Sequence, residues 1–192
     1  MFEGAYTAII TPFDKNGAVD FGKLRALIEM QVKNGIDGIV PVGTTGESPT
    51  LDYEEHEKVV ETCVEAARKR VKVIAGTGAN STREALELTK HAKEAGADGT
   101  LQVTPYYNKP NQAGLIKHFS AVADLGLPTI LYNIPGRSAR EIEVATVAEL
   151  SKHPNIVAVK EAGGSVDRVS QTLAGRVKEL ADTAGDPLAG PL

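Results

Sequence analysis

The sequence predicts an α/β fold with a parallel sheet, and two observations support this prediction. Short apolar runs alternate with amphipathic segments of helical periodicity over most of the 192 residues. The apolar runs begin about 27 to 33 residues apart, which is the length of one strand, one helix and two loops. Six such units in strict alternation fit either a doubly wound open sheet or a TIM-type (β/α) barrel, although a closed barrel requires eight units.

The strands are predicted from the apolar runs. They are expected at residues 5–11, 38–42, 71–75, 99–104, 129–132 and 156–160. The sixth run, residues 155–162, is rich in β-branched residues and predicts a buried parallel strand with Lys160 at its carboxyl end. A lysine in that place is either a surface charge at a strand terminus or a nucleophile in an apolar site.

Capping residues indicate where the helices between the strands begin. Asp20 is a suitable N-cap for the first helix, and Asp52 with Glu55 and Ser81 with Glu84 have the spacing of capping boxes for the second and third. Further helices are expected at about 112–124, 144–153 and 166–181. Residues 1–182 are therefore predicted to form one incomplete barrel domain, and the Gly-, Pro- and Ala-rich residues 183–192 a loose tail.

Composition restricts the class of protein. An apolar content of 42% and a charged content of 24% are typical of a globular domain. The net charge of −4 argues against nucleic acid or an anionic membrane as a partner. We find neither a signal peptide nor an apolar run long enough to span a bilayer. A single cysteine, Cys63, fits a reducing compartment, so a cytoplasmic protein is expected.

Polar residues follow the strands, at the edge where ligands bind in both α/β architectures. Thr44 and Thr45 follow the second strand within a glycine-rich loop, which is suited to holding a carboxylate. Tyr107 follows the fourth strand, and Tyr132 and Arg137 lie at and after the end of the fifth. We expect these side chains to converge near Lys160.

No metal site is expected. The four histidines are far apart on predicted helices and lack the spacing of metal ligands. His91 and His118 are interpreted as residues of helix surfaces. Cys63 lies on an apolar stripe and is interpreted as a packing residue rather than a nucleophile.

These groups suggest imine chemistry. A desolvated lysine amine attacks a carbonyl to form a Schiff base, which then activates the neighbouring carbon. Tyr132 is placed to relay protons, and Thr44 could link it to another tyrosine. Arg137 can hold a carboxylate with two hydrogen bonds.

Four motifs, in order and in spacing, resemble the dihydrodipicolinate synthase (4-hydroxy-tetrahydrodipicolinate synthase) family of pyruvate-dependent class I aldolases. They are VGTTGES at 42–48, VTPYYN at 103–108, LYNIPGR at 131–137 and VKEA at 159–162. The resemblance implies a TIM-type barrel of which this chain carries about six of the eight units. Family members complete two more units after the sixth and add a helical segment, so the sequence is identified as a C-terminally truncated member.

The resemblance also implies roles for individual residues. Lys160 would form the Schiff base with pyruvate, and Tyr132 would relay protons through Thr44 to Tyr107. Thr44 and Thr45 would hold the pyruvate carboxylate, and Arg137 that of aspartate 4-semialdehyde. The product would feed diaminopimelate and lysine synthesis, and no metal or organic cofactor is implied.

The family also implies association and regulation. The tyrosine matching Tyr107 works beside one from a neighbouring subunit, which implies a homo-oligomer, either a dimer or a dimer of dimers. Many members are inhibited by lysine at a dimer interface. Positions that match this effector site are Ser48, His56, Asn80, Glu84 and Tyr106. Tyr53 stands where lysine-sensitive members often carry histidine, so inhibition is left open.

Two other functions remain open. One is a related pyruvate lyase with a sugar-acid substrate, such as N-acetylneuraminate lyase or ketodeoxygluconate aldolase, although Tyr106, Tyr107 and Arg137 favour the synthase. The other is a non-catalytic remnant or interaction subunit, because a six-unit chain would leave its first and sixth strands as open edges. A small departure from the family is Ala139, where many members have glycine.

Overall fold

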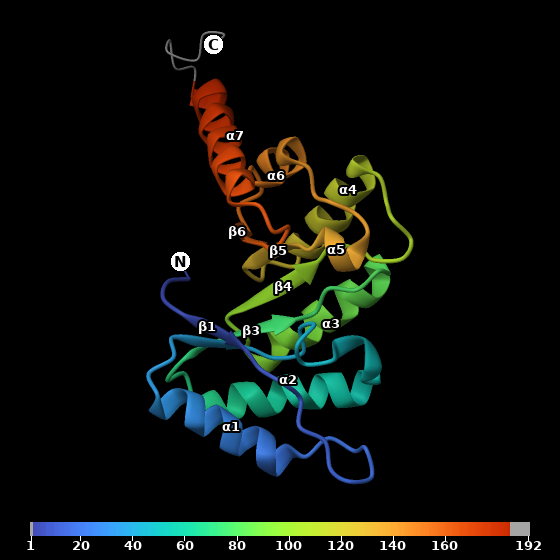
Figure 1. The fold of residues 1–192 in the computed structure, drawn as a ribbon, viewed down its shortest axis with the longest axis vertical. Helices are drawn as coiled ribbons and strands as arrows, with labels where there is room; N and C mark the ends of the chain where they lie inside the picture. The colour runs from blue at the N-terminus through green and yellow to red at the C-terminus, as the bar shows by residue number, and fades with distance from the viewer. Residues whose placement is uncertain (1, 185–192) are drawn as a thin grey trace.

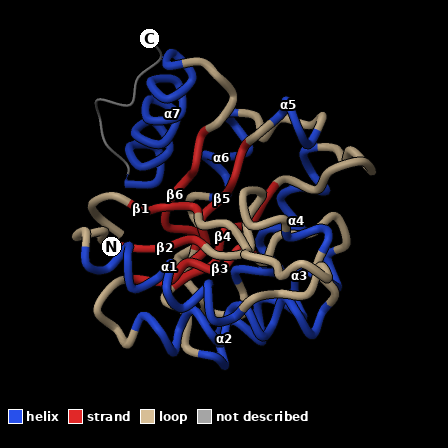
Figure 2. The backbone as a smooth tube through the Cα atoms, turned by 60° about the horizontal axis from the view of Figure 1, so that its bottom comes forward, coloured by secondary structure: helices blue, strands red, loops and turns tan. Residues whose placement is uncertain are grey.

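A computed structural model describes residues 2–184. Six parallel strands form one sheet in the order β1 to β6. Their bounds are Tyr6–Ala8, Gly38–Val40, Lys72–Gly76, Gly99–Val103, Thr129–Asn133 and Ile156–Glu161. In a doubly wound sheet the strand order reverses partway, whereas here each strand lies beside the next one in sequence. The fold is therefore the six-stranded part of a TIM-type barrel, with strands inside and helices outside (Figure 2).

Helices connect the strands and cover their outer face (Figure 1). The α-helices, α1 to α7, are Phe21–Lys33, Tyr53–Ala67, Thr82–Ala95, Gln112–Ala123, Pro135–Ser138, Val144–Leu150 and Val166–Ala184. The short α5 and the 3₁₀ turn η1, Ser48–Thr50, were not predicted, because a single turn has no apolar periodicity. Of the predicted tail, residues 183–184 belong to α7, and 185–192 lie outside the described residues.

The predicted caps form, with one exception. The Asp20 carboxylate accepts a hydrogen bond from the Lys23 N–H at 2.9 Å. Asp52 and Glu55 complete a capping box, each side chain accepting from the other residue's N–H. Ser81 forms only its own half of the expected box, by accepting from the Glu84 N–H. These bonds satisfy N–H groups that have no partner within the helix.

The core lies on both faces of the sheet. Between the sheet and α1 and α2, a large cluster includes Leu24, Ile39 and Cys63, all fully buried. Burial raises the pKa of the Cys63 thiol to about 12, in keeping with a packing role. On the inner face, a smaller cluster contains Ile74 and Tyr132. In the described part of the chain, no helix is long and apolar enough to cross a membrane.

His118 corrects an expectation. It was predicted to lie on a helix surface, but it is 5% exposed between α3 and α4. Its Nδ1 lies 2.9 Å from the Thr82 hydroxyl, and its ring packs edge-on against Phe119. Desolvation lowers the pKa of His118 to about 4, so the ring is neutral at pH 7.

β6 is less buried than its sequence predicts. Ile156 is buried, but Val157 is 39% exposed and Lys160 is also exposed. Within the described sheet, β6 is an edge strand that pairs only with β5. Its open side borders an apolar cavity of about 510 Å³ beneath α7, which includes Val169 and Leu173 of that helix. An apolar run of this kind predicts a strand, but it does not indicate whether another strand pairs with the far edge of that strand.

Candidate active site

A cavity of about 220 Å³ lies at the carboxyl ends of the strands. The ends of four strands, β2 to β5, and the segments that follow them contribute to its wall. The residues that line it are Val42, Gly43, Thr44, Ser48, Pro49, Gly78, Val103, Tyr106, Tyr132, Ile134, Arg137 and Ser138. Of the residues predicted to act on substrate, the structure thus brings Thr44, Tyr132 and Arg137 to one cavity.

The loop after β2 is fixed from two sides. The buried Thr11 hydroxyl donates to the Gly46 carbonyl at 2.7 Å. The N–H groups of Gly46 and Ser48 both bond to the Gly43 carbonyl within the loop. Among the hydrogen bonds of the described residues, none uses the N–H of Thr44 or Thr45. These two amides and their hydroxyls are therefore the donors that remain for a carboxylate.

Lys160 and Tyr132 face each other across the β5–β6 pair. They occupy opposite positions in the strand register. The Lys160 Nζ lies 4.1 Å from the centroid of the Tyr132 ring, which is the geometry of a cation–π contact. Lys160 is not itself among the residues that line the cavity, but its amine lies over the ring of Tyr132, which does line it. It is more exposed than a lysine enclosed by a complete barrel would be.

Arg137 and the tyrosine pair lie on neighbouring loops. Arg137 belongs to α5, whose Ser138 hydroxyl bonds to the carbonyls of Ile134 and Arg140. Tyr106 lines the cavity, whereas the next residue, Tyr107, is 91% exposed. Tyr107 also has φ of 68°, which a bulky residue adopts only at a cost. Sequence analysis assigned Tyr106 to the effector site alone and missed its place in this cavity.

The arrangement suits a small keto acid. A primary amine lies over a tyrosine ring, the loop after β2 offers N–H and hydroxyl donors, and a guanidinium stands on α5. Among the described residues, no three His, Cys, Asp or Glu side chains gather as a metal site requires. The groups present serve carbonyl addition and carboxylate binding.

A smaller cavity of about 50 Å³ adjoins the first and shares Ser48, Pro49, Gly78 and Tyr106 with it. Four of the five predicted effector residues, Ser48, His56, Glu84 and Tyr106, line this second cavity. The fifth, Asn80, follows Ala79 of its wall, and its carbonyl accepts from the Asn108 side chain at 2.9 Å.

His56 is buried in this wall, with Nε2 lying 2.9 Å from the Gly76 carbonyl. Burial lowers the pKa of His56 and raises the pKa of Tyr106.

Comparison with known proteins agrees with this geometry. Residues 1–187 match the sequence model of the dihydrodipicolinate synthetase family. The chain belongs to this family.

Individual relatives support the assignment. The 4-hydroxy-tetrahydrodipicolinate synthase of Citrifermentans bemidjiense is 62% identical over 175 residues, 91% of this chain and 60% of that protein. A chloride-inhibited dihydrodipicolinate synthase from Acinetobacter baumannii, solved with pyruvate, is 48% identical with a TM-score of 0.90 and covers 93% of this chain. The family member from Cyanidioschyzon merolae, solved with lysine bound, is 42% identical with a TM-score of 0.88, over 93% of this chain.

The match covers only part of these dihydrodipicolinate synthetase relatives. The chain spans 62% of the length of the A. baumannii chain and 61% of that from C. merolae. More than a third of each of these relatives therefore lies outside the match. This agrees with the open edge of β6 and with the exposure of Lys160.

Proposed function

We propose that the protein condenses pyruvate with aspartate 4-semialdehyde through an imine on Lys160, as a 4-hydroxy-tetrahydrodipicolinate synthase of lysine and diaminopimelate synthesis. The observation that carries the proposal is the position of the Lys160 Nζ, 4.1 Å from the centre of the ring of Tyr132, which lines one cavity together with Thr44 and Arg137. Family membership and the pyruvate complex of a relative support the same substrate.

The first half of the reaction forms the imine. The neutral Lys160 amine adds to the keto carbon of pyruvate, and the tetrahedral adduct loses its hydroxyl as water with a proton from Tyr132. The pyruvate carboxylate lies on the amides and hydroxyls of Thr44 and Thr45, which the loop leaves without partners among the described residues. The protonated imine draws electrons from the adjacent methyl group, which loses a proton to the Tyr132 phenolate left by the previous step and gives an enamine.

The second half joins the two substrates. The enamine carbon attacks the aldehyde carbon of the semialdehyde, whose oxygen takes up a proton as the new carbon–carbon bond forms. Arg137 holds the carboxylate of this second substrate. Tyr132 exchanges protons with Tyr107 through Thr44, and attack by the substrate amine on the imine carbon releases Lys160. No metal or organic cofactor is needed for these steps.

Association and regulation form part of the proposal. Tyr107 is exposed and strained, as expected of a residue that completes a site together with a neighbouring subunit, so we propose a homo-oligomer, a dimer or a dimer of dimers. The second cavity is proposed to bind lysine as an inhibitor, supported by the lysine-bound relative. The cytoplasm is the proposed location.

A second candidate function is that of an interaction subunit without catalysis. The open edge of β6 and the apolar cavity beneath α7 favour it, because such surfaces associate with other chains. A sugar-acid lyase has no comparable observation in its favour.

Reduction with borohydride in the presence of pyruvate tests the proposal. The catalytic reading predicts a carboxyethyl substituent on Lys160, found by peptide mass mapping, and condensation when aspartate 4-semialdehyde is added. Condensation with N-acetylmannosamine instead would favour the sugar-acid lyase. A folded chain that forms no adduct would leave only the hypothesis of an interaction subunit. Size-exclusion chromatography would then test whether the chain forms a complex with a full-length relative.

A further inference from the structure

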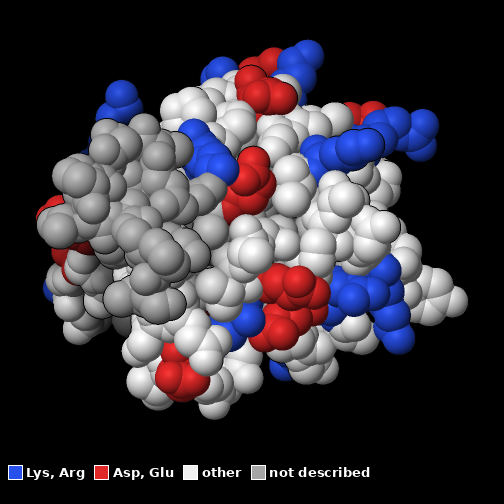
Figure 3. Space-filling view, turned by 90° about the horizontal axis from the view of Figure 1, so that it is seen from above, with Lys and Arg blue, Asp and Glu red and all other residues white. Residues whose placement is uncertain are grey.

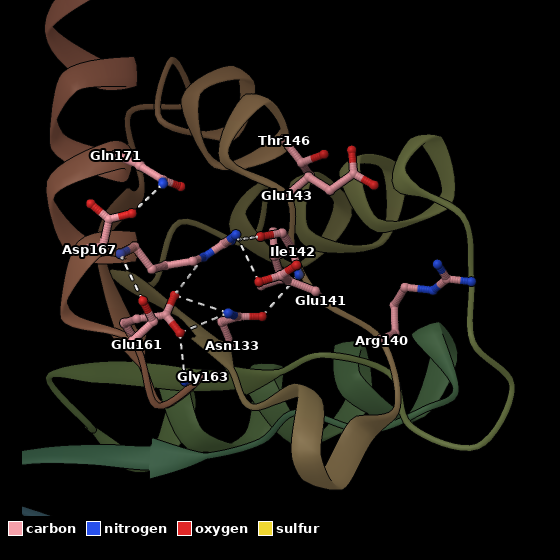
Figure 4. Close-up of polar contacts among 12 residues, drawn as sticks. Asn133, Arg140, Glu141, Ile142, Glu143, Thr146, Glu161, Gly163, Asp167 and Gln171 are labelled. Atoms are coloured by element: carbon pink, nitrogen blue, oxygen red, sulfur yellow. Dashed lines mark hydrogen bonds and ion pairs between the residues drawn. The ribbon is translucent and has the colours of Figure 1, made fainter.

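A buried polar cluster joins the carboxyl ends of β5 and β6 to α7 (Figure 4). We call Asn133, Glu161 and Arg168 the β6 clamp. The Glu161 carboxylate accepts hydrogen bonds from the Asn133 side-chain amide at 2.9 and 3.0 Å, from the Gly163 N–H at 2.7 Å and from the Arg168 Nε at 3.3 Å. Its oxygens are thus held from three directions.

The clamp also reaches the segment before α6. Asn133 is fully buried, and its side-chain oxygen accepts from the Ile142 N–H at 2.9 Å. The Arg168 guanidinium donates to the Ile142 carbonyl and pairs with Glu141 at 2.8 Å. The side chains of Arg168 and Glu161 are only 12% and 13% exposed. A charge pair with so little exposure is less screened by solvent than a surface pair, and its hydrogen bonds hold it more firmly in one geometry.

The register of β6 explains why a clamp is needed at this place. Thr129 lies opposite Ile156, but the next residue, Ile130, lies opposite Ala158, so Val157 is an extra residue in β6. Beyond this irregularity, Tyr132 lies opposite Lys160, and Asn133 opposite Glu161. The first pair of the ladder therefore does not by itself determine which residue faces Tyr132.

An uninterrupted ladder would give a different site. If Ile156 still faced Thr129 and no residue were extra, Val159 would lie opposite Tyr132, and Lys160 opposite Asn133. Successive side chains of a strand point to opposite faces, so this slip of one residue would turn Lys160 from the inner face to the helix face. The Asn133–Glu161 pair is the side-chain contact that exists only in the observed register.

We propose that the β6 clamp is a positioning element for Lys160. Glu161, held by Asn133 and Arg168, fixes the register of β6 beyond its extra residue and so places the Lys160 amine over Tyr132. The proposal rests on the imine chemistry proposed above, and it assigns to Glu161 and Arg168 a role in the rate of imine formation without contact with substrate.

Trapping kinetics test this role. The rate of adduct formation on Lys160 is measured with borohydride over a range of pyruvate concentrations, for the unchanged chain and for Glu161→Ala. A displaced amine predicts a fall of about 100-fold in the maximal rate. The half-saturating pyruvate concentration stays within about threefold, because Thr44 and Thr45 are unaltered. Glu161→Gln, which keeps an acceptor for the Gly163 N–H, recovers much of the rate.

Asp98→Ala is the matched control. The Asp98 carboxylate likewise accepts from a backbone N–H of a neighbouring strand, that of Val73 at 2.9 Å, and pairs with Lys72 at 2.7 Å. It lies at the amino ends of the strands, away from Lys160. We expect Asp98→Ala to change the stability of the chain and to leave the maximal trapping rate unchanged. Equal losses of rate in Asp98→Ala and Glu161→Ala would overturn the positioning role.

A second measurement does not depend on pyruvate. In lysine-labelled protein, the methylene next to the Lys160 Nζ gives an NMR signal shifted by the Tyr132 ring, assigned by its loss in Lys160→Arg. The proposal predicts that Glu161→Ala abolishes this shift and Asp98→Ala retains it; a shift retained in Glu161→Ala contradicts the proposal even in a chain that forms no imine. If Glu161→Ala does not fold, Arg168→Lys carries the same comparison, and Glu161→Gln is expected to retain the shift.

Discussion

Substitution of Gly76 by alanine tests how closely β3 supports the loop that carries Thr44. A methyl group on Gly76 would lie 2.4 Å from the Val42 carbonyl oxygen, 2.7 Å from its carbon and 2.8 Å from the Gly43 nitrogen. All three are backbone atoms, and ordinary contacts are near 3.5 Å, so the loop must move by about 1 Å. Overpacking of this kind costs about 1–3 kcal/mol of unfolding free energy, and we expect the upper end because backbone has to yield.

The assay is urea unfolding followed by circular dichroism, since the chain has no tryptophan. The pyruvate trapping rate should fall as well, because Thr44 moves with Gly43. Gly136→Ala is the control: it is also near the cavity, in α5, but its added methyl would have no atom within 4 Å. An unchanged unfolding midpoint and an unchanged trapping rate for Gly76→Ala would refute the close packing of β3 against the loop.

Three further predictions follow from buried or strained residues. The pKa of His118 is about 4 in the folded chain and 6.5 when unfolded, so this residue stabilises the fold fully above pH 6.5. The unfolding free energy then falls by about 3 kcal/mol as the pH drops from 6.5 to 4. Urea unfolding at several pH values should show this dependence on pH, and His118→Gln should weaken it. Ala139→Gly should raise the unfolding free energy by about 1 kcal/mol, because Ala139 has φ of 53°, and a lowered unfolding free energy would contradict the left-handed backbone. The Cys63 thiol, with its pKa raised to about 12, should react with a thiol reagent only as fast as the chain unfolds, and immediate reaction in native buffer would contradict its burial.

Local signals in the sequence were sufficient for most of the fold. Asp20 and Asp52 form the caps that their positions predict, because capping requires only residues within one turn. The strict alternation of elements predicted a parallel sheet, and the resemblance selected the barrel, which the sequential strand order confirms. Residues at strand ends, such as Thr44 and Tyr132, reached a common cavity because parallel strands end at one edge.

The features that the sequence did not predict depend on contacts between residues that are far apart in the chain. The apolar pattern of β6 is the same whether or not another strand covers it, so the exposure of Val157 was not predictable from the run itself. His118 was misplaced because its burial comes from packing between α3 and α4. Glu161 follows Lys160 in the motif, but its role depends on Arg168 and Asn133, and no local rule links Glu161 to Asn133.

The positions of Lys160 and Tyr132 carry the proposed function, and one measurement tests them directly. The chain is reduced with borohydride in the presence of pyruvate, digested, and each lysine-containing peptide is weighed. The account predicts a carboxyethyl group on Lys160, formed faster than on any other lysine, and its loss in Lys160→Arg. Modification spread evenly over the surface lysines, or none on a chain shown by circular dichroism to be folded, would contradict the assignment of Lys160 as the imine-forming residue.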